Sequence, residues 1–282
     1  MIPPVVPATF LSDHPDAVVA DVRWYLDGRS GRDAHAAGHL PGAVFVDLDA
    51  VLAGAASPEA GRHPLPEPQV FADGMAAAGI GDDSVVVAYD DAGGASAGRL
   101  VWLLRMLGVD ATVLDGGSTH WSGGLEEGPV VPTPAHFTPR PWPADALATI
   151  DDAVTVPVVV DARAPERYRG EEEPVDPRAG HVPGAINLPF ADNLTDGRFK
   201  SPAALRERFE AAGITDAAGV VVYCGSGVTA CHDLIALEYA GLGRATLYPG
   251  SWSQWSNTDR PAATGGEPGS RPTVGPTGRL GS

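Results

Sequence analysis

Four sequence blocks occur twice in this chain of 282 residues, in the same order and at a nearly constant separation. The first set is residues 18–25, 37–46, 77–90 and 114–121, and the second is residues 158–165, 179–188, 211–224 and 248–255. The separations lie between 134 and 142 residues. Since solenoid repeats span only about 20–50 residues, each copy is long enough to be a whole domain. The duplication therefore predicts two copies of one fold.

Within each copy, short apolar β-branched runs alternate with helical patterns. Apolar residues at helical spacing occupy residues 98–107 and 229–241. Predicted strands lie at residues 18–19, 85–87, 113, 158–160, 220–222 and 246–247. Strands that alternate with helices indicate a parallel sheet covered on both faces. The predicted fold class is α/β, with two tandem domains that each hold a parallel sheet flanked by helices.

The copies predict the domain boundaries. We expect a first domain at residues 1–127 and a second at residues 144–260. Residues 128–143 are rich in proline, which disfavours helix and stiffens a linker. Residues 261–282 combine few apolar side chains with much glycine and proline, so we expect a flexible tail.

Charge and composition narrow the class of protein. The chain has 36 acidic and 19 basic residues and a formal net charge of −17, which argues against nucleic-acid and anionic-membrane partners. A few arginines can still form a local pocket for a small anion. Two cysteines exclude a disulfide scaffold, and no apolar run reaches the roughly 18 residues of a membrane span. With no signal-peptide pattern at the start, we expect a cytoplasmic protein.

The two copies differ most directly after the predicted strands at residues 85–87 and 220–222. The first copy continues with Asp90, whereas the second continues with Cys224 and a glycine-rich turn into a helix. Backbone N–H groups of such a turn and the helix N-terminus favour a thiolate. Cys224 is therefore a candidate nucleophile, although a buried structural cysteine is the alternative. The predicted cradle for its sulfur is Gly225, Ser226, Gly227, Val228 and Thr229.

Cys231 is a separate case. It lies seven residues beyond Cys224, about 10.5 Å along a helix. Since a disulfide needs Cα atoms within about 7 Å, we expect Cys231 to be a packed thiol.

The tandem repeat, the GH-x-PGA turn in both copies and CGSGVTA in the second copy alone resemble the two-domain rhodanese sulfurtransferases. The uncharged loop is similar to that of the 3-mercaptopyruvate sulfurtransferase branch. The resemblance implies a catalytically silent first domain and a persulfide on Cys224. It implies a small anionic sulfur donor, an acceptor such as thioredoxin, a small thiol or cyanide, and no metal or organic cofactor.

The resemblance also implies further site residues. Arg167 and Arg178 match the substrate arginines of that branch, although an acidic insert sets them eleven residues apart. Arg99 matches an arginine of the first domain that reaches the interdomain cleft in this family, which implies a substrate-binding role. A proton relay is implied for Ser226, His39 and Asp33.

Other functions compete with this interpretation. Thiosulfate is the alternative donor for the same chemistry. A phosphatase of the related cysteine-loop type needs an arginine six residues after the cysteine, where this chain has Ala230. A scaffold that only docks a partner would not carry a labile sulfur atom.

Overall fold

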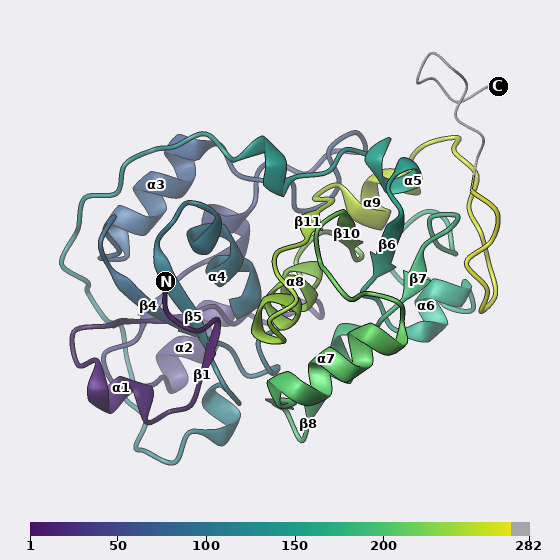
Figure 1. Ribbon diagram of the computed structural model, residues 1–282. Coiled ribbons are helices and arrows are strands. Elements are labelled where there is room, and N and C mark those ends of the chain that lie inside the picture. Colours follow the sequence, from purple (N-terminus) through teal and green to yellow (C-terminus); the bar gives the residue numbers. More distant parts are fainter. Residues whose placement is uncertain (272–282) are drawn as a thin grey trace. The chain divides into compact units, whose positions relative to one another are not determined.

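The computed structural model describes residues 1–271 and divides the chain into two units (Figure 1). Unit 1 comprises residues 1–54, 65–143 and 194–200, and unit 2 comprises residues 55–64, 144–193 and the described residues after 200. Residues 272–282 of the predicted tail lie outside the described residues.

Unit 1 holds a five-stranded parallel sheet in the order β1-β5-β4-β2-β3. Its strands are β1 (Val5–Val6), β2 (Val18–Asp21), β3 (Val44–Phe45), β4 (Val85–Tyr89) and β5 (Asp110–Leu114). Its helices are α1 (Phe10–Asp13), α2 (Gly31–Ala37), α3 (Pro68–Ala77) and α4 (Ala97–Met106).

Unit 2 repeats this plan with a four-stranded parallel sheet in the order β11-β10-β6-β7. The strands are β6 (Val158–Asp161), β7 (Ile186–Asn187), β10 (Val220–Tyr223) and β11 (Thr246–Leu247). The helices are α5 (Asp152–Thr155), α6 (Pro165–Arg169), α7 (Pro202–Ala211), α8 (Ala230–Tyr239) and α9 (Ser251–Trp255). The predicted α/β class with two parallel sheets is confirmed.

Residues shared by the two copies build the fold. In unit 2, the Arg163 guanidinium donates to the Asp161 carboxylate and to the Gly180 carbonyl, each at 2.6 Å. The same two contacts in unit 1 join Arg23 to Asp21 and to Gly38. Because a buried guanidinium needs paired acceptors, this trio ties the end of β2 in unit 1, and of β6 in unit 2, to a glycine carbonyl further along the chain.

One short segment of each copy is grouped with the other unit. Residues 55–64 belong to unit 2 and contain an antiparallel bridge between Ser57 and Gly61. Residues 194–200 belong to unit 1 and form the antiparallel pair β8 (Leu194–Thr195) and β9 (Arg198–Phe199). The predicted boundaries did not include this exchange, because the segments are short and lack a long apolar run.

The predicted linker is part of unit 1. The N–H of Ala135 donates to the Ala76 carbonyl at 2.9 Å, and the Phe137 ring packs edge-on against Phe71. The proline-rich segment was predicted to be a stiff linker, and in the structure its extended chain buries the Phe137 side chain in unit 1.

Part of the predicted tail is also packed, which corrects that expectation for residues 261–271. Ala263 pairs with His181 in an antiparallel bridge, and the N–H of Gly184 donates to the Pro268 carbonyl at 2.6 Å. These backbone hydrogen bonds hold a segment that has few apolar anchors.

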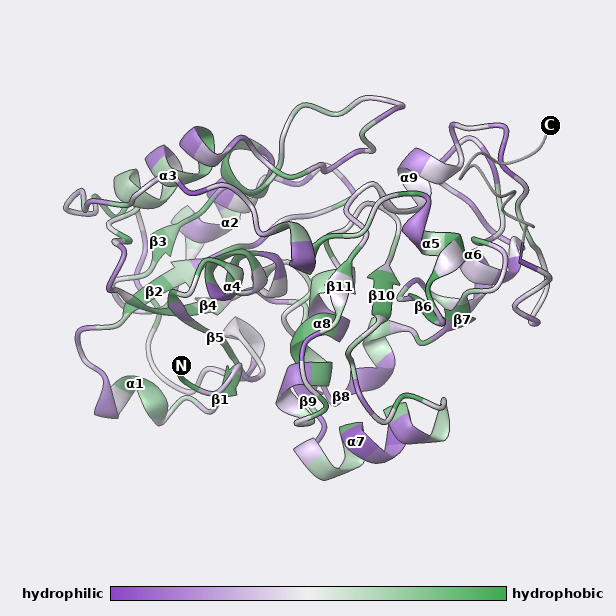
Figure 2. Cartoon of the chain, turned by 45° about the horizontal axis from the view of Figure 1, so that its top comes forward, coloured by the Kyte–Doolittle hydropathy of each residue, from purple (hydrophilic) through white to green (hydrophobic). Residues whose placement is uncertain are grey.

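The strands are largely apolar in both units, whereas α7 alternates polar and apolar residues (Figure 2). In α7 the buried residues are Leu205 and Phe209. By contrast, α8 is buried from Ala230 to Leu237. No helix within residues 1–271 is long and apolar enough to cross a membrane.

The buried helix α8 carries one carboxyl group in an unfavourable setting. Asp233 is fully buried, accepts a hydrogen bond from Asn193 at 2.5 Å, and has no partner at Oδ2. Burial raises the pKa of Asp233 to about 7, and Arg208 opposes the rise. Since an aspartate in the unfolded chain has a pKa near 3.8, the folded state binds the proton more tightly.

We therefore expect Asp233 to destabilise the protein increasingly as the pH rises from about 4 to about 7. Asp233→Asn should remove this dependence, so its stability relative to the parent should improve by roughly 3 kcal/mol between pH 5 and pH 8. Denaturant unfolding of both proteins at the two pH values measures the difference. A difference that does not change with pH would contradict the assignment.

Candidate active site

Cys224 is the first residue after β10, at the carboxyl end of a parallel strand and six residues before α8 begins. Ligands of α/β folds bind at this edge. The residue is 2% exposed, and its Sγ accepts a hydrogen bond from the N–H of Gly227 at 3.1 Å. The structure thus places one of the predicted cradle amides on the sulfur.

Helix α9 orients the rest of the loop. The N–H groups of Trp252 and Ser253 donate to the carbonyls of Cys224 and Gly225, at 3.0 and 2.8 Å. In a trans peptide, the carbonyl and the next N–H point in opposite directions. The N–H groups of Gly225 and Ser226 therefore point away from α9.

Two backbone conformations allow this arrangement. Ser251 has φ of 53°, and its Oγ accepts the N–H of Cys224 at 3.2 Å. Gly227 has φ of 80°, and a Cβ there would lie 2.7 Å from the Pro249 carbonyl oxygen. Only glycine fits this position, for both conformational and steric reasons.

Unit 1 shows the same loop around a different group. Asp90 takes the place of Cys224, and its carboxylate accepts four backbone N–H groups at 2.8–2.9 Å. The donors are Ala92, Gly94, Ser96 and Ala97. The copy without a cysteine therefore retains an anion cradle that its own side chain fills.

Two arginines lie beside the start of the cysteine loop. A Cβ on Gly225 would be 3.0 Å from Nη2 of Arg62 and 3.3 Å from Nη1 of Arg167. Arg167 contacts Glu173 at 2.7 Å and Asp176 at 3.3 Å, and Asp176 also pairs with Arg62. Burial raises the pKa of Asp176, and both arginines oppose the rise.

Ser226 has a histidine partner that the sequence analysis missed. Its Oγ and Nδ1 of His63 are 2.7 Å apart, and both residues are 8% exposed. A signal was available, because residues 61–64 (GRHP) match residues 197–200 (GRFK), so that histidine occurs in one copy and phenylalanine in the other.

His39, the histidine of the predicted relay, has partners within its own unit, and its part in a relay remains a prediction. In unit 1, Nδ1 of His39 bonds to the His35 carbonyl at 2.9 Å and the two rings stack, so His39 supports its own turn. Asp33 is exposed in the first turn of α2. The His-x-Pro-Gly turn of the other copy uses His181 in the same way, on the Tyr168 carbonyl.

Two other predicted arginines bind backbone carbonyls. Arg178 donates from Nε, Nη1 and Nη2 to three carbonyls of residues 255–260, at 2.9–3.0 Å. Arg99, fully buried on α4, donates to the Leu52 carbonyl in unit 1. Their roles toward a donor remain predictions, and the contacts of Arg178 favour a structural role.

Two further residues of the predicted cradle lie between Gly227 and α8. Val228 is buried, and Thr229 directly precedes α8. Cys231 is fully buried and its thiol donates to the Gly227 carbonyl at 3.4 Å, which fits the predicted packed thiol.

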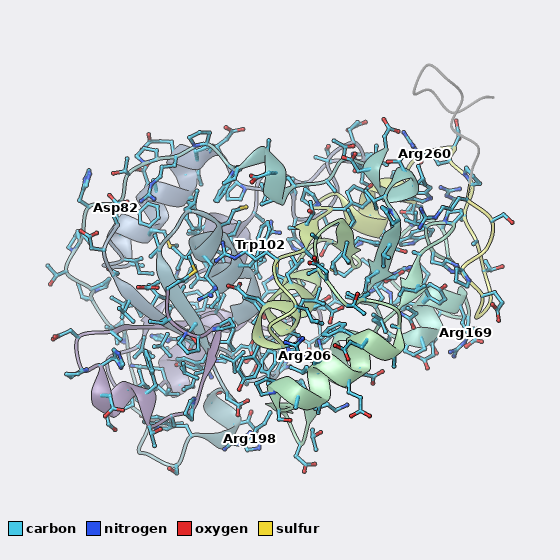
Figure 3. All side chains as sticks on the ribbon, viewed as in Figure 1. Asp82, Trp102, Arg169, Arg198, Arg206 and Arg260 are labelled. Carbon is cyan, nitrogen blue, oxygen red and sulfur yellow. The ribbon has the colours of Figure 1, made fainter. Side chains whose placement is uncertain are left out.

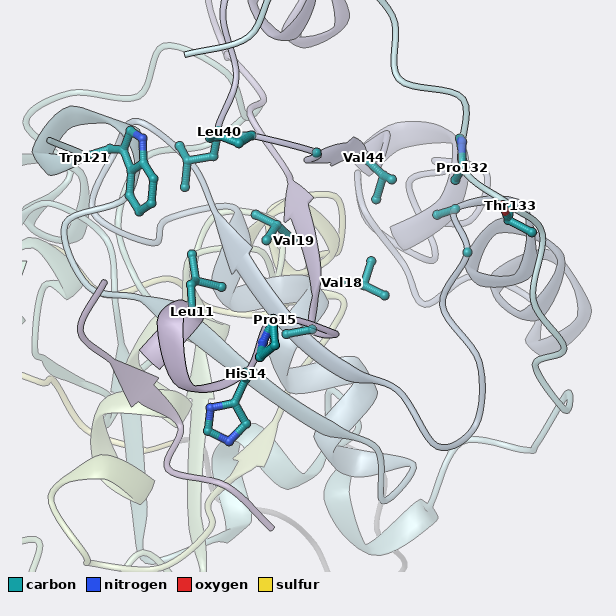
Figure 4. Close-up of a pocket in the computed structure, with 15 residues that line it drawn as sticks. Leu11, His14, Pro15, Val18, Val19, Leu40, Val44, Trp121, Pro132 and Thr133 are labelled. Atoms are coloured by element: carbon teal, nitrogen blue, oxygen red, sulfur yellow. The ribbon is translucent and has the colours of Figure 1, made fainter. Parts of the chain in front are cut away.

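A hollow elsewhere in the chain offers no such chemistry. Figure 4 shows a pocket of about 470 Å³ in unit 1, lined mainly by apolar side chains, with His14 as its titratable group. Within residues 1–271, no three His, Cys, Asp or Glu side chains are grouped so that they could hold a metal ion.

The rhodanese-like domain matches residues 10–123 and again residues 143–258. The chain belongs to the rhodanese-like family.

Similar proteins span nearly the whole rhodanese-like chain. The probable 3-mercaptopyruvate sulfurtransferase of Pseudomonas aeruginosa is 44% identical over an alignment of 268 residues, and the match covers 89% of this chain and 93% of that protein. The putative thiosulfate sulfurtransferase SseB of Mycobacterium tuberculosis is 40% identical over 88% of this chain and 90% of its own. The crystal structure of the 3-mercaptopyruvate sulfurtransferase SseA from Escherichia coli has a TM-score of 0.77 at 31% identity, covering 89% of this chain and 99% of that chain.

The effect of the hydrogen bond from the Gly227 N–H to the Cys224 sulfur can be tested without any substrate. Gly227→Ala should displace the amide from Sγ and slow alkylation of Cys224 by iodoacetamide at pH 7 by about tenfold, because a thiolate loses a charge-assisted hydrogen bond. Peptide mass spectrometry measures the rate.

Gly213→Ala is the matched control. Gly213 has φ of 84°, but a Cβ there would meet nothing within 4 Å. It should leave the alkylation rate unchanged. Equal rates in both variants would mean that the Gly227 amide does not activate the sulfur.

Proposed function

We propose that this protein is a sulfurtransferase that moves sulfur from 3-mercaptopyruvate to a thiol or to cyanide through a persulfide on Cys224. The observation that carries the proposal is the Gly227 N–H on the Cys224 sulfur, in a loop whose preceding carbonyls are bound by α9. Such a loop stabilises a thiolate before the reaction and the persulfide anion after it.

The first half-reaction is a displacement at sulfur. The Cys224 thiolate attacks the donor's sulfur, a sulfur–sulfur bond forms, and the carbon–sulfur bond breaks. The electron pair of the broken bond stays on carbon, so pyruvate leaves as its enolate and takes up a proton. In the second half-reaction an acceptor thiolate or cyanide attacks the outer sulfur and Cys224 leaves as the thiolate.

The arginines supply the anion-binding part. A donor carboxylate at the loop would face the guanidinium groups of Arg62 and Arg167, which lie next to Gly225. Nε of Arg167 is buried and has no hydrogen-bond partner, so the Glu173 and Asp176 carboxylates do not use every donor of this guanidinium. Arg62 thus joins the predicted arginines Arg167, Arg178 and Arg99.

Ser226 and His63 form the proton-transfer part. Their 2.7 Å contact lets the serine hydroxyl pass a proton to the enolate carbon while the histidine replaces it. Thiosulfate has no carbon to protonate, because its leaving group is sulfite.

The sulfur donor could also be thiosulfate, as the name of the mycobacterial relative suggests for that protein. The loop residues after Cys224 are Gly225 and Ser226, without a basic side chain, which favours a singly charged donor over a dianion. The name of the Pseudomonas relative agrees with this preference.

The acceptor and the cellular location are proposals from the sequence. Thioredoxin, a small thiol or cyanide would all attack an exposed outer sulfur in the same way. We propose a cytoplasmic location, which fractionation of the producing cells would test.

With cyanide as a common acceptor, we expect kcat/KM to be higher for 3-mercaptopyruvate than for thiosulfate. Cys224→Ser should abolish turnover of both donors, and it should not gain the mass of about 32 Da that one sulfur atom adds to the loaded parent. Turnover by the variant would exclude the persulfide. If the enzyme prefers thiosulfate, it is still a sulfurtransferase, but the proposed preference for 3-mercaptopyruvate is wrong.

His63→Asn separates the proton relay from sulfur transfer. We expect kcat for 3-mercaptopyruvate to fall by about a hundredfold, the usual contribution of a general acid, and kcat for thiosulfate to change little. Steady-state rates with both donors measure the split. An equal loss for both donors would mean that His63 only supports the loop.

A further inference from the structure

A chain of alternating charges runs from the fold of unit 2 to the cysteine loop. Each side chain forms an ion pair with the next one in the series. The first four nitrogen–oxygen distances are 2.6, 3.3, 2.7 and 3.3 Å, and the fifth contact is a close ion pair. In order they are Asp161, Arg163, Glu173, Arg167, Asp176 and Arg62.

The two middle carboxylates are buried and held in place. The side chains of Glu173 and Asp176 are 4% and 3% exposed. Oε1 of Glu173 also accepts the N–H groups of Val175 and Asp176, at 3.2 and 3.0 Å. Because buried carboxylates are costly unless they are paired, these groups stay on their arginines instead of turning to solvent.

The arginines at the loop therefore carry their own counter-charges. Arg62 and Arg167 lie beside Gly225, and Glu173 and Asp176 offset both formal charges. Without the carboxylates, an anion at Cys224 would face two uncompensated guanidinium groups. With them, the local formal charge is zero, while the guanidinium Nη groups of Arg62 and Arg167 beside Gly225 can still bind a carboxylate oxygen.

We infer that Glu173 and Asp176 are specificity-determining residues that make the site favour a sulfur donor with one negative charge over a donor with two. The physical reason is that a Coulomb energy scales with the charge of the ligand, so each positive charge removed weakens a dianion twice as much as a monoanion. The inference rests on the proposed function, since it concerns the donor of that reaction.

Asp176→Asn keeps the size of the side chain and removes one negative charge. We expect kcat/KM for thiosulfate to rise about tenfold and kcat/KM for 3-mercaptopyruvate about threefold, because the logarithm of the change follows ligand charge. Glu173→Gln should change the two donors in the same direction and serves as the second variant if Asp176→Asn does not fold.

Glu171→Gln is the matched control on the same loop. Glu171 is 56% exposed and pairs with the solvent-facing Arg169, which Figure 3 labels. Glu171→Gln removes one negative charge outside the network, where solvent and salt screen that charge. The ratio of kcat/KM for thiosulfate to kcat/KM for 3-mercaptopyruvate should stay at the parent value. An equal change of the ratio in Asp176→Asn and Glu171→Gln would overturn the inference.

A second measurement does not depend on turnover. Sulfate, a dianion, and pyruvate, a monoanion, should each protect Cys224 from iodoacetamide. In Asp176→Asn the protecting concentration should fall about tenfold for sulfate and about threefold for pyruvate. Equal shifts for sulfate and pyruvate would overturn the inference that Asp176 sets the preference for a singly charged anion. If these shifts occur in a protein that does not turn over 3-mercaptopyruvate, the proposed donor fails and the inference stands.

Discussion

The direction of the peptide groups in the loop after β10 is the constraint on which the site depends. The carbonyls of Cys224 and Gly225 are bound by α9, so the N–H groups that follow them face the other way. This requires Ser251 at positive φ and a residue without a side chain at Gly227. A thiolate in this loop is stabilised by fixed dipoles that need no reorganisation during the reaction.

Unit 1 shows that this constraint belongs to the fold and not to the chemistry. Its loop closes around the Asp90 carboxylate with four N–H groups, although no cysteine is present. The contacts of Arg163 with Asp161 and Gly180 in unit 2 likewise have equivalents in unit 1. What distinguishes unit 2 is the group in the cradle and the charged side chains beside it.

Those charged side chains act as a connected set. Arg167 reaches the loop from α6, Arg62 comes from the exchanged segment, and Glu173 and Asp176 join them. The acidic insert, residues 171–173, which made the match of Arg178 irregular in the sequence, therefore supplies one counter-charge of the site, Glu173, and Asp176 supplies the other. Arg178 instead binds three carbonyls of residues 255–260.

The sequence by itself determined the duplication, the parallel sheets and the position of Cys224, because periodicity and a glycine-rich turn after an apolar strand are local signals. Only the tertiary structure decided which side chains meet at the loop. His63 and Ser226 are 163 residues apart, and Arg62 and Asp176 are 114 apart. No local pattern encodes contacts of that range, since they depend on residues 55–64 being grouped with unit 2.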